Sequence, residues 1–305
     1  MTRRMRTATI GLFTGLTLAA APISASLSPS AAADIKGRSP ASQSAASAVT
    51  PGGASSASLA AATRRLVWRD DFTGPAGTAA NKQYWNYEAG GSGWGNQELQ
   101  RYTTSTANAG LDGAGHLAIT AREDGSGSQC WYGTCRYTSA RLTTQGKVTS
   151  KLGRVEARMK LPAGQGLWPA FWMLGANLRT VGHPDCGEVD IMELVGNEPF
   201  RSWASVHGPG YTGLSAPFDL ALGRTFADRF HVFALDRTST SLTFSVDGTV
   251  FHRVTPDNLN GGRWVFSKPF FLIMNLAVGG RWPGDPGPQT RFPATTLVDY
   301  VAVYR

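Results

Sequence analysis

GEVDIMELVG, residues 187–196, is the stretch that decides the fold. It sets Glu188, Asp190 and Glu193 among apolar residues, and carboxylates in such surroundings are costly unless they serve a purpose. Glu188 and Asp190 share one face of a strand, whereas Glu193, five residues after Glu188, would face the other way. One extra residue at Ile191-Met192, a β-bulge, returns all three acids to one face. The β-branched flanks and the lack of helix caps disfavour a helix.

The same three acids suit glycoside hydrolysis. That reaction needs one carboxylate to attack the anomeric carbon and one carboxylic acid to protonate the leaving oxygen. A third acid between them can share a proton, and crowded like charges raise the pKa of one member. The alternative is a strand face on which the three acids are merely solvated.

Period-two alternation of apolar and polar residues continues on both sides of this segment. In residues 153–161, GRVEARMKL, every second side chain is apolar, and SLTFSVDG (241–248) predicts a strand that ends in a hairpin turn at Asp247-Gly248. Further strands are predicted in HLAITAR (116–122), YTSARLTTQ (137–145), FHVFALD (230–236), FFLIMNLAV (270–278) and LVDYVAVYR (297–305). Many short strands, few helices and frequent Gly and Pro predict an antiparallel β-sandwich or barrel.

The first 63 of the 305 residues have the composition of a leader and a linker. A basic head, a short apolar run and Ala31-Ala32-Ala33 predict a signal peptide over residues 1–33, and therefore a secreted, extracellular protein. A transmembrane anchor is the alternative, but the apolar run is short and broken by Pro22. Residues 34–63, rich in Ala, Ser and Gly, predict a disordered linker or pro-segment. The folded domain is expected at residues 64–305.

Charge limits the expected partners. The chain has 29 basic and 21 acidic residues, and residues 1–63 hold five of the former and one of the latter, which leaves 24 and 20, a net charge of +4, for the folded domain. Because this part has no Lys/Arg run, nucleic acid is not expected as a partner. Nor is a membrane, since no later stretch is long and apolar enough to span one. We expect a monomer.

The three cysteines fit an exported protein. Cys130 and Cys135 bracket the loop CWYGTC, which predicts a local disulfide, with two free thiols as the alternative. Cys186 is left over, and we expect it to be buried and inert.

The motif G-E-x-D-x-x-E resembles the signature of glycoside hydrolase family 16, in the laminarinase-like branch that carries the bulge, as in actinobacterial endo-β-1,3-glucanases. Other segments resemble that family in its order, across essentially all of residues 64–305: GWGNQELQRYT (93–103), GHLAITAR (115–122), YTSARLTT (137–144), GRVEARMKLPAGQGLWPAFWMLG (153–175), ASVHGPGY (204–211), FHVFALD (230–236), FFLIMNLAVGGRWPG (270–284) and VDYVAVYR (298–305). The resemblance implies a β-jelly-roll sandwich of two antiparallel sheets with a concave substrate cleft. It also implies double displacement with net retention, with Glu188 as nucleophile, Glu193 as acid/base and Asp190 as assisting acid.

The resemblance places further residues in the cleft. Trp168 and Trp172 share a strand face, and flat aromatic rings suit sugars, although core packing is the alternative. Arg141 can donate to sugar hydroxyls, and His207 can hydrogen-bond near the cleaved bond unless it is a satisfied core residue. The other candidates are Trp94, Asn96, Glu98, Asn275 and Trp282, with Trp131 and Trp203 as weaker ones. A Gly-turn loop with a surface Trp is the alternative for residues 93–98.

No catalytic cofactor is expected, but the resemblance implies a structural Ca²⁺ on the convex face. The matching positions are around Asp71, Gly115 and Asp299, and oxygen ligands are what this ion takes. Asp299 could equally accept backbone hydrogen bonds at a strand end.

The leading functional hypothesis is a secreted retaining endo-β-1,3-glucanase on laminarin- or curdlan-like polymers. A mixed-linkage β-1,3-1,4-glucanase is the enzymatic alternative, although such enzymes of this family usually lack the extra residue of the bulge. A non-catalytic β-glucan recognition protein is the alternative from another class. Relatives of that kind have lost the catalytic acids, whereas Glu188 and Glu193 are both present here.

Overall fold

The computed structural model describes residues 64–305, so the predicted signal peptide (1–33) and linker (34–63) lie outside the described residues. A ten-stranded sheet consists of β1 (Leu66–Asp70), β3 (Gln100–Tyr102), β4 (Ala109–Leu111), β5 (Leu117–Glu123), β8 (Tyr137–Ser139), β11 (Gly153–Lys160), β16 (His231–Arg237), β17 (Leu242–Val246), β18 (Thr249–Val254) and β20 (Ala294–Tyr304). An eight-stranded sheet consists of β2 (Asn86–Glu88), β9 (Arg141–Thr143), β10 (Thr149–Ser150), β12 (Leu167–Gly175), β13 (Glu188–Glu193), β14 (Arg201–His207), β15 (Ala216–Asp219) and β19 (Phe270–Val278). The remaining elements are the ribbon β6 (Gln129–Cys130) and β7 (Gly133–Thr134), the helix α2 (Leu178–Val181) and the 3₁₀ helix η1 (Pro256–Leu259).

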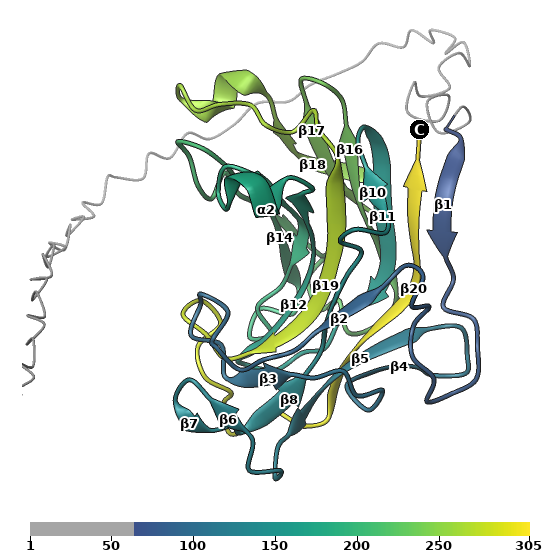
Figure 1. Cartoon of the computed structure of the whole chain (residues 1–305), viewed down its shortest axis with the longest axis vertical. Helices are drawn as coiled ribbons and strands as arrows, with labels where there is room; N and C mark the ends of the chain where they lie inside the picture. Colours follow the sequence, from purple (N-terminus) through teal and green to yellow (C-terminus); the bar gives the residue numbers. More distant parts are fainter. Residues whose placement is uncertain (1–63) are drawn as a thin grey trace, which may run out of the picture. The chain divides into compact units, whose positions relative to one another are not determined.

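The two large sheets lie against each other, and the eight-stranded one bends around an open, concave side (Figure 1). Its strands run in the order β15-β14-β13-β12-β19-β9-β2, all antiparallel to their neighbours. The ten-stranded sheet is also antiparallel, except for the parallel pair β3 and β8. This arrangement confirms the predicted all-β sandwich of two antiparallel sheets.

The core fills the space between the sheets. Val155, Ala157 and Met159 of β11 are fully buried, and they belong to the same apolar cluster as Phe171 and Met173 of β12. Alternation therefore decides which side chains meet the core, because successive residues of a strand point to opposite faces. The predicted alternation in residues 153–161 is confirmed.

Two local predictions about chain geometry are also confirmed. The strands β17 and β18 form a hairpin, and Asp247 and Gly248 at its turn both have positive φ angles, 48° and 82°. Positive φ at both central residues is what a two-residue hairpin turn that follows the twist of its strands requires. Cys130 and Cys135 form a disulfide within the β6–β7 ribbon, and Cys186 is a buried free thiol.

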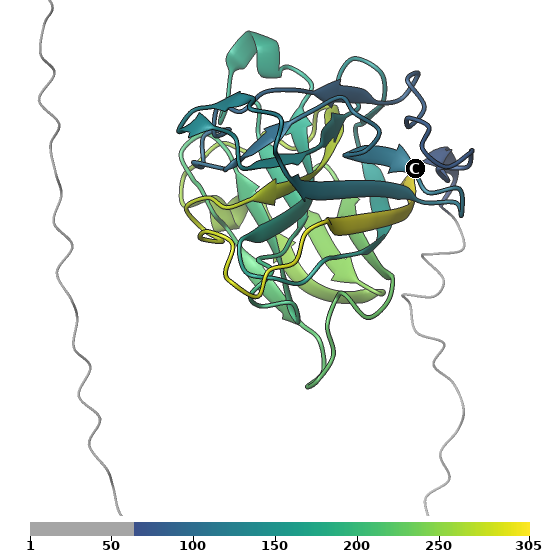
Figure 2. The same cartoon turned by 90° about the horizontal axis from the view of Figure 1, so that it is seen from below.

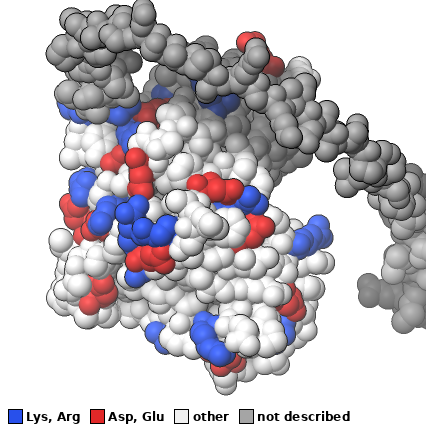
Figure 3. All heavy atoms as spheres, turned by 180° about the vertical axis from the view of Figure 1, so that it is seen from behind, with Lys and Arg blue, Asp and Glu red and all other residues white. Residues whose placement is uncertain are grey.

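The outer surface carries mixed charge. On the face shown in Figure 3, acidic and basic side chains are interspersed. Two carboxylates that the sequence singled out, Asp71 and Asp299, are paired with Arg69 (2.6 Å) and Arg158 (2.5 Å). In the part of the chain that the structure describes, no helix is long and apolar enough to cross a membrane. The helix α2 is a single turn that stands out from the sheets at the edge of the domain (Figures 1 and 2).

Candidate active site

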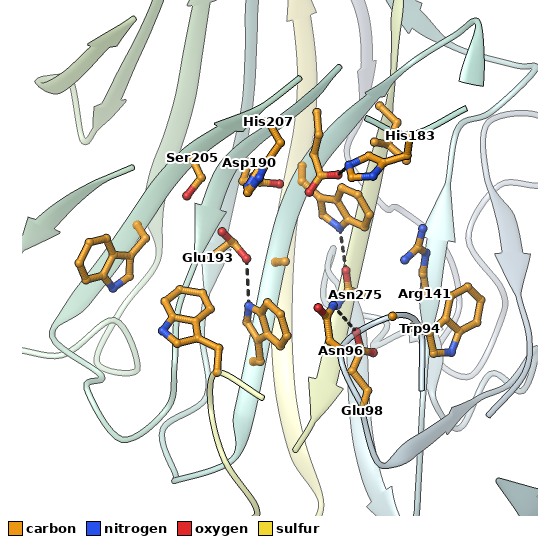
Figure 4. Close-up of a pocket in the computed structure, with 18 of the residues that line it drawn as sticks. Trp94, Asn96, Glu98, Arg141, His183, Asp190, Glu193, Ser205, His207 and Asn275 are labelled. Carbon is orange, nitrogen blue, oxygen red and sulfur yellow. Dashed lines mark hydrogen bonds and ion pairs between the residues drawn. The ribbon is translucent and has the colours of Figure 1, made fainter. Parts of the chain in front are cut away.

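A β-bulge in β13 aligns the three acids. Asp190 pairs with Ser205 of β14 and Glu193 pairs with Trp203, so three steps along β13 match two steps along its neighbour. On the other side of β13, the register against β12 shifts at the same place. The predicted extra residue at Ile191-Met192 is therefore confirmed, and Glu188, Asp190 and Glu193 all line one pocket. Figure 4 shows Asp190 and Glu193 in this pocket.

The concave side holds a pocket of about 870 Å³. Along β12, side chains point alternately to the pocket and to the core. Trp168, Ala170 and Trp172 face the pocket, whereas Phe171 and Met173 lie in the core. The pocket is lined by Trp94, Gly95, Asn96, Glu98, Arg141, Trp168, Ala170, Trp172, Leu174, His183, Glu188, Asp190, Glu193, Trp203, Ser205, His207, Ser215, Asn275 and Trp282. All twelve residues predicted for catalysis and substrate binding are in this set.

The carboxyl groups lie close to one another and to a histidine. One oxygen each of Glu188 and Asp190 and a ring nitrogen of His207 lie within 4.8 Å of one another. The indole Nε1 of Trp168 donates to Oε1 of Glu193 at 3.1 Å (Figure 4). Asp190 is only 3% exposed, and its Oδ2 makes no hydrogen bond although His207 Nε2 lies 3.3 Å away. A buried carboxyl oxygen without a partner is costly when ionised, which favours the protonated form of Asp190.

The pKa values of Asp190 and Glu193 are both raised, as a carboxyl group that donates a proton requires. Burial, and then the charge of Glu188, raises the pKa of Asp190 well above its usual range. Burial also raises the pKa of Glu193 well above its usual range, with the charges of Asp190 and Glu188 adding to the effect. Glu193 can therefore hold a proton at pH values where an exposed glutamate has lost it.

His207 is held by its own strand and the turn that follows. Its Nδ1 accepts a hydrogen bond from the backbone N–H of Gly213 at 3.2 Å and lies 2.7 Å from the Thr212 hydroxyl. Because Nδ1 acts as an acceptor, the ring proton is on Nε2, which faces Asp190. The alternative of a histidine satisfied within the core does not apply, since His207 is only half-buried and lines the pocket.

Aromatic rings cover the Glu193 side of the pocket. Trp282 packs edge-on against Trp168, with ring centroids 5.5 Å apart, and against Trp203 at 6.3 Å. Trp282 is 45% exposed, so part of its ring is open to a ligand. Such rings offer apolar faces to sugars, and the N–H of Trp168 stays hydrogen-bonded to Glu193.

Charged and amide groups occupy the other side of the pocket. The Arg141 guanidinium lies between the rings of Trp94 and Trp172, 4.8 and 4.7 Å from their centroids, and it pairs with Glu88. Trp172 Nε1 donates to Oδ1 of Asn275 at 2.8 Å. These contacts fix polar groups that can bind sugar hydroxyls.

Glu98 is a buried hub of hydrogen bonds at this end. Its carboxyl group accepts from Asn96 (3.2 Å), Gln100 (2.6 Å) and Tyr102 (3.1 Å). Burial raises the pKa of Glu98. The residue therefore holds Asn96 in place at the pocket wall.

Sequence reasoning missed several lining residues. His183, Ser205 and Ser215 line the pocket, and so does Trp203, which was only a weak candidate. His183 lies on the irregular loop before β13, where no alternation indicates a direction. Trp131, the other weak candidate, does not line the pocket, and its Nε1 donates to the Glu98 carbonyl at 2.8 Å.

The residues expected to hold Ca²⁺ have other partners. Asp71 and Asp299 are both neutralised by arginine, as described above, which makes them poor ligands as they stand. Among residues 64–305, the one grouping of His, Cys, Asp and Glu side chains close enough for a metal ion is Glu188, Asp190 and His207, which belongs to the pocket itself. The Ca²⁺ site expected near Asp71, Gly115 and Asp299 therefore stays a prediction.

Carboxyl groups beside aromatic rings in a concave β-sandwich are the groups that cleavage of a carbohydrate chain requires. The family model for "Glycosyl hydrolases family 16" matches residues 96–302. A beta-glucanase from Rhodothermus marinus is 40% identical over 254 residues, which cover 79% of this chain and 85% of that protein. The X-ray structure of an endo-beta-1,3-glucanase from Pyrococcus furiosus matches with a TM-score of 0.75 and 47% identity, over 79% of this chain and 94% of the other. The laminarinase catalytic domain from Thermotoga maritima MSB8 matches with a TM-score of 0.74 and 42% identity, over 79% of this chain and 98% of the other.

The chain belongs to glycosyl hydrolase family 16 and is a glycoside hydrolase. This confirms the resemblance drawn from the sequence and, with it, the jelly-roll form of the sandwich.

Proposed function

We propose that this enzyme is a secreted, retaining endo-β-1,3-glucanase that cuts internal bonds of laminarin- and curdlan-type glucans. The observation that carries the proposal is the bulged strand β13, which puts Glu188, Asp190 and Glu193 side by side in a cleft with aromatic walls. The names of the relatives, an endo-beta-1,3-glucanase and a laminarinase among them, support the choice of linkage.

In the proposed first step, Glu188 attacks the anomeric carbon. A bond forms between a Glu188 oxygen and that carbon, the glycosidic C–O bond breaks, and the leaving oxygen takes the proton of Glu193. In the second step, Glu193 accepts a proton from water, the water oxygen bonds to the anomeric carbon, and the Glu188 ester bond breaks. Two inversions at one carbon leave its configuration unchanged.

Asp190 has an assisting role in this proposal. It lies between the two glutamates on β13, and its raised pKa lets it hold a proton next to Glu188. A proton shared between the two groups limits the repulsion of neighbouring carboxylates. The reaction as proposed uses carboxyl groups and water, without a catalytic cofactor.

The test is reducing-sugar release by residues 34–305 from laminarin, curdlan, barley mixed-linkage glucan, carboxymethylcellulose and agarose. Cleavage of laminarin and curdlan, absent in Glu188→Gln, is the expected result. Cleavage of the mixed-linkage glucan alone would keep the mechanism and replace the substrate. Glucan binding without cleavage by the wild-type enzyme would favour the recognition protein instead.

The enzyme is proposed to be a secreted monomer. A structural calcium site is the last part of the proposal. If Ca²⁺ binds near Asp71, Gly115 and Asp299, it must displace the arginines from both carboxylates, and it would then stabilise the fold rather than take part in the reaction. Removing Ca²⁺ with EDTA should then lower the melting temperature, with Asp299→Asn as the control that has already lost the effect. An unchanged melting temperature would rule the site out.

A further inference from the structure

His183 contacts the proposed nucleophile directly. Its Nε2 lies 2.8 Å from Oε2 of Glu188, a closer approach than that of His207 to Asp190. The His183 side chain is 49% exposed, and that of Glu188 is 21% exposed. In the view of Figure 4, His183 lies on the same side of the pocket as Arg141, away from Glu193. The imidazole thus reaches the pocket from a loop and meets a carboxylate there.

The loop that carries His183 is held by its own backbone. The N–H of Cys186 donates to the carbonyl of Gly182 at 2.8 Å, and the N–H of Gly187 donates to Pro184 at 2.9 Å. Cys186 is buried, which anchors the loop immediately before β13. The imidazole therefore has a supported position, as a partner that orients another group requires.

The charges around His183 favour its protonated form. The groups that face it are Glu188 from β13 and His207 from β14. The hydrogen bond to Glu188 raises the pKa of His183, and the effects of burial and of His207 oppose this rise without cancelling it. Asp185, from the same loop, is paired with Arg263 at 3.3 Å. His183 consequently carries its charge to a higher pH than a free imidazole does.

We infer that His183 is a positioning residue for Glu188, whose carboxylate it orients by holding one oxygen at its Nε2. This inference rests on the proposed function, in which Glu188 is the nucleophile. The carboxylate charge disappears when the Glu188 ester forms and returns when water displaces it. An imidazolium favours the charged form, so His183 assists the step in which the carboxylate leaves. The effect of its loss is therefore larger on the second step than on the first.

The test compares His183→Ala and His183→Gln on an aryl β-glycoside of a β-1,3-linked glucose disaccharide. An aryl leaving group makes the first step fast, so kcat reports the second step. With alanine, kcat should fall about tenfold, the effect of one pKa unit of lost charge stabilisation. KM should fall with it, because slowing only the second step leaves kcat/KM nearly unchanged. Glutamine restores a donor without the charge, so it should recover part of kcat.

His116→Ala is the matched control. His116 pairs with Asp112 at 2.7 Å and stacks on Phe230, so this variant also removes a histidine–carboxylate pair, but one that does not line the pocket. It should change neither kcat nor KM. The inference is overturned if His183→Ala leaves kcat and KM unchanged, or if His116→Ala lowers them as much. A wild-type enzyme that cleaves no β-glucan would instead contradict the proposed function, which separates the two failures.

Discussion

Two groups of carboxylates on neighbouring sheets have opposite surroundings. On the outer face of β11, Glu156 is 8% exposed, and its two oxygens accept from Arg154 (2.5 Å), Tyr300 (3.1 Å) and Tyr304 (3.2 Å). The same Arg154 bonds Asp236 at 2.8 Å. On β13, by contrast, the acids face one another and two histidines, and no arginine of residues 64–305 pairs with them.

The difference separates a structural carboxylate from a reactive one. Arginine and hydroxyl donors satisfy both oxygens of Glu156, which then contributes to folding. The acids of β13 lack such donors, so burial and mutual repulsion raise the pKa values of Asp190 and Glu193. Residue type and low exposure are thus similar in the two groups, and the partners decide the role.

The largest difference in activity between the two groups should appear when one carboxylate charge is removed from each. Glu188→Gln should lower kcat on laminarin by about 10⁴-fold, because the nucleophile is lost. Glu156→Gln should keep kcat within a few-fold of the wild type, since the residue lies on the other sheet. Reducing-sugar assays on both purified variants measure this. Comparable losses of kcat in the two variants would mean that the β13 acids affect activity through the stability of the fold.

Glu193→Ala should produce the next largest effect. Loss of the general acid should slow laminarin cleavage by about 10³-fold, whereas the first step on an aryl glycoside with a very good leaving group should be nearly unchanged. Added azide should then restore the second step and yield a β-configured glycosyl azide, detected by NMR. Equal losses on both substrates, without an azide product, would contradict the acid/base role.

For Glu156, the expected effect is on stability. Glu156→Gln weakens charge-assisted hydrogen bonds that are largely buried, and it should lower the free energy of unfolding by about 1–3 kcal/mol. Urea denaturation followed by tryptophan fluorescence measures this. If stability is unchanged, the Arg154–Glu156 pair does not contribute to the fold, and the proposed contrast with β13 disappears.

Asp190→Asn should have the smallest effect, and a stabilising one. A carboxyl pKa that is raised in the folded state lets the folded protein keep a proton that the unfolded chain releases, so stability falls as pH rises above the unfolded pKa of about 3.9. Because asparagine does not ionise, the variant does not lose stability in this way as pH rises. Its melting temperature should exceed that of the wild type near pH 7 by about 2–4 °C and match it below pH 4.

Asp219 provides the control of opposite sign. Its hydrogen bond from Arg201 lowers its pKa, so its contribution to stability is present at neutral pH and is lost as pH falls through the folded-state pKa. Asp219→Asn should therefore lower the melting temperature near pH 7. Identical pH trends for the two variants would contradict the assignment of a raised pKa to Asp190.

The regular strands and the acids they carry could be predicted well from the sequence. Alternation located β11 and β17, and the spacing of Glu188, Asp190 and Glu193 indicated the bulge before any register was known. His183 could not be found in this way. It lies on a loop where side-chain direction follows no period, and its distance from Glu188 depends on backbone hydrogen bonds within that loop.

The sequence by itself determined the class of fold and the bulged strand with its three acids, because strand periodicity and a run of acids are local properties of the chain. The other predicted cleft residues came from the resemblance to the family. Only the tertiary structure decided which carboxylates have a positively charged partner. It paired Asp71 and Asp299 with arginines, brought His183 to Glu188, and left Asp190 buried with an oxygen that makes no hydrogen bond. Burial and ion pairing depend on which strands and loops pack together, and the spacing of residues along one strand does not contain that information.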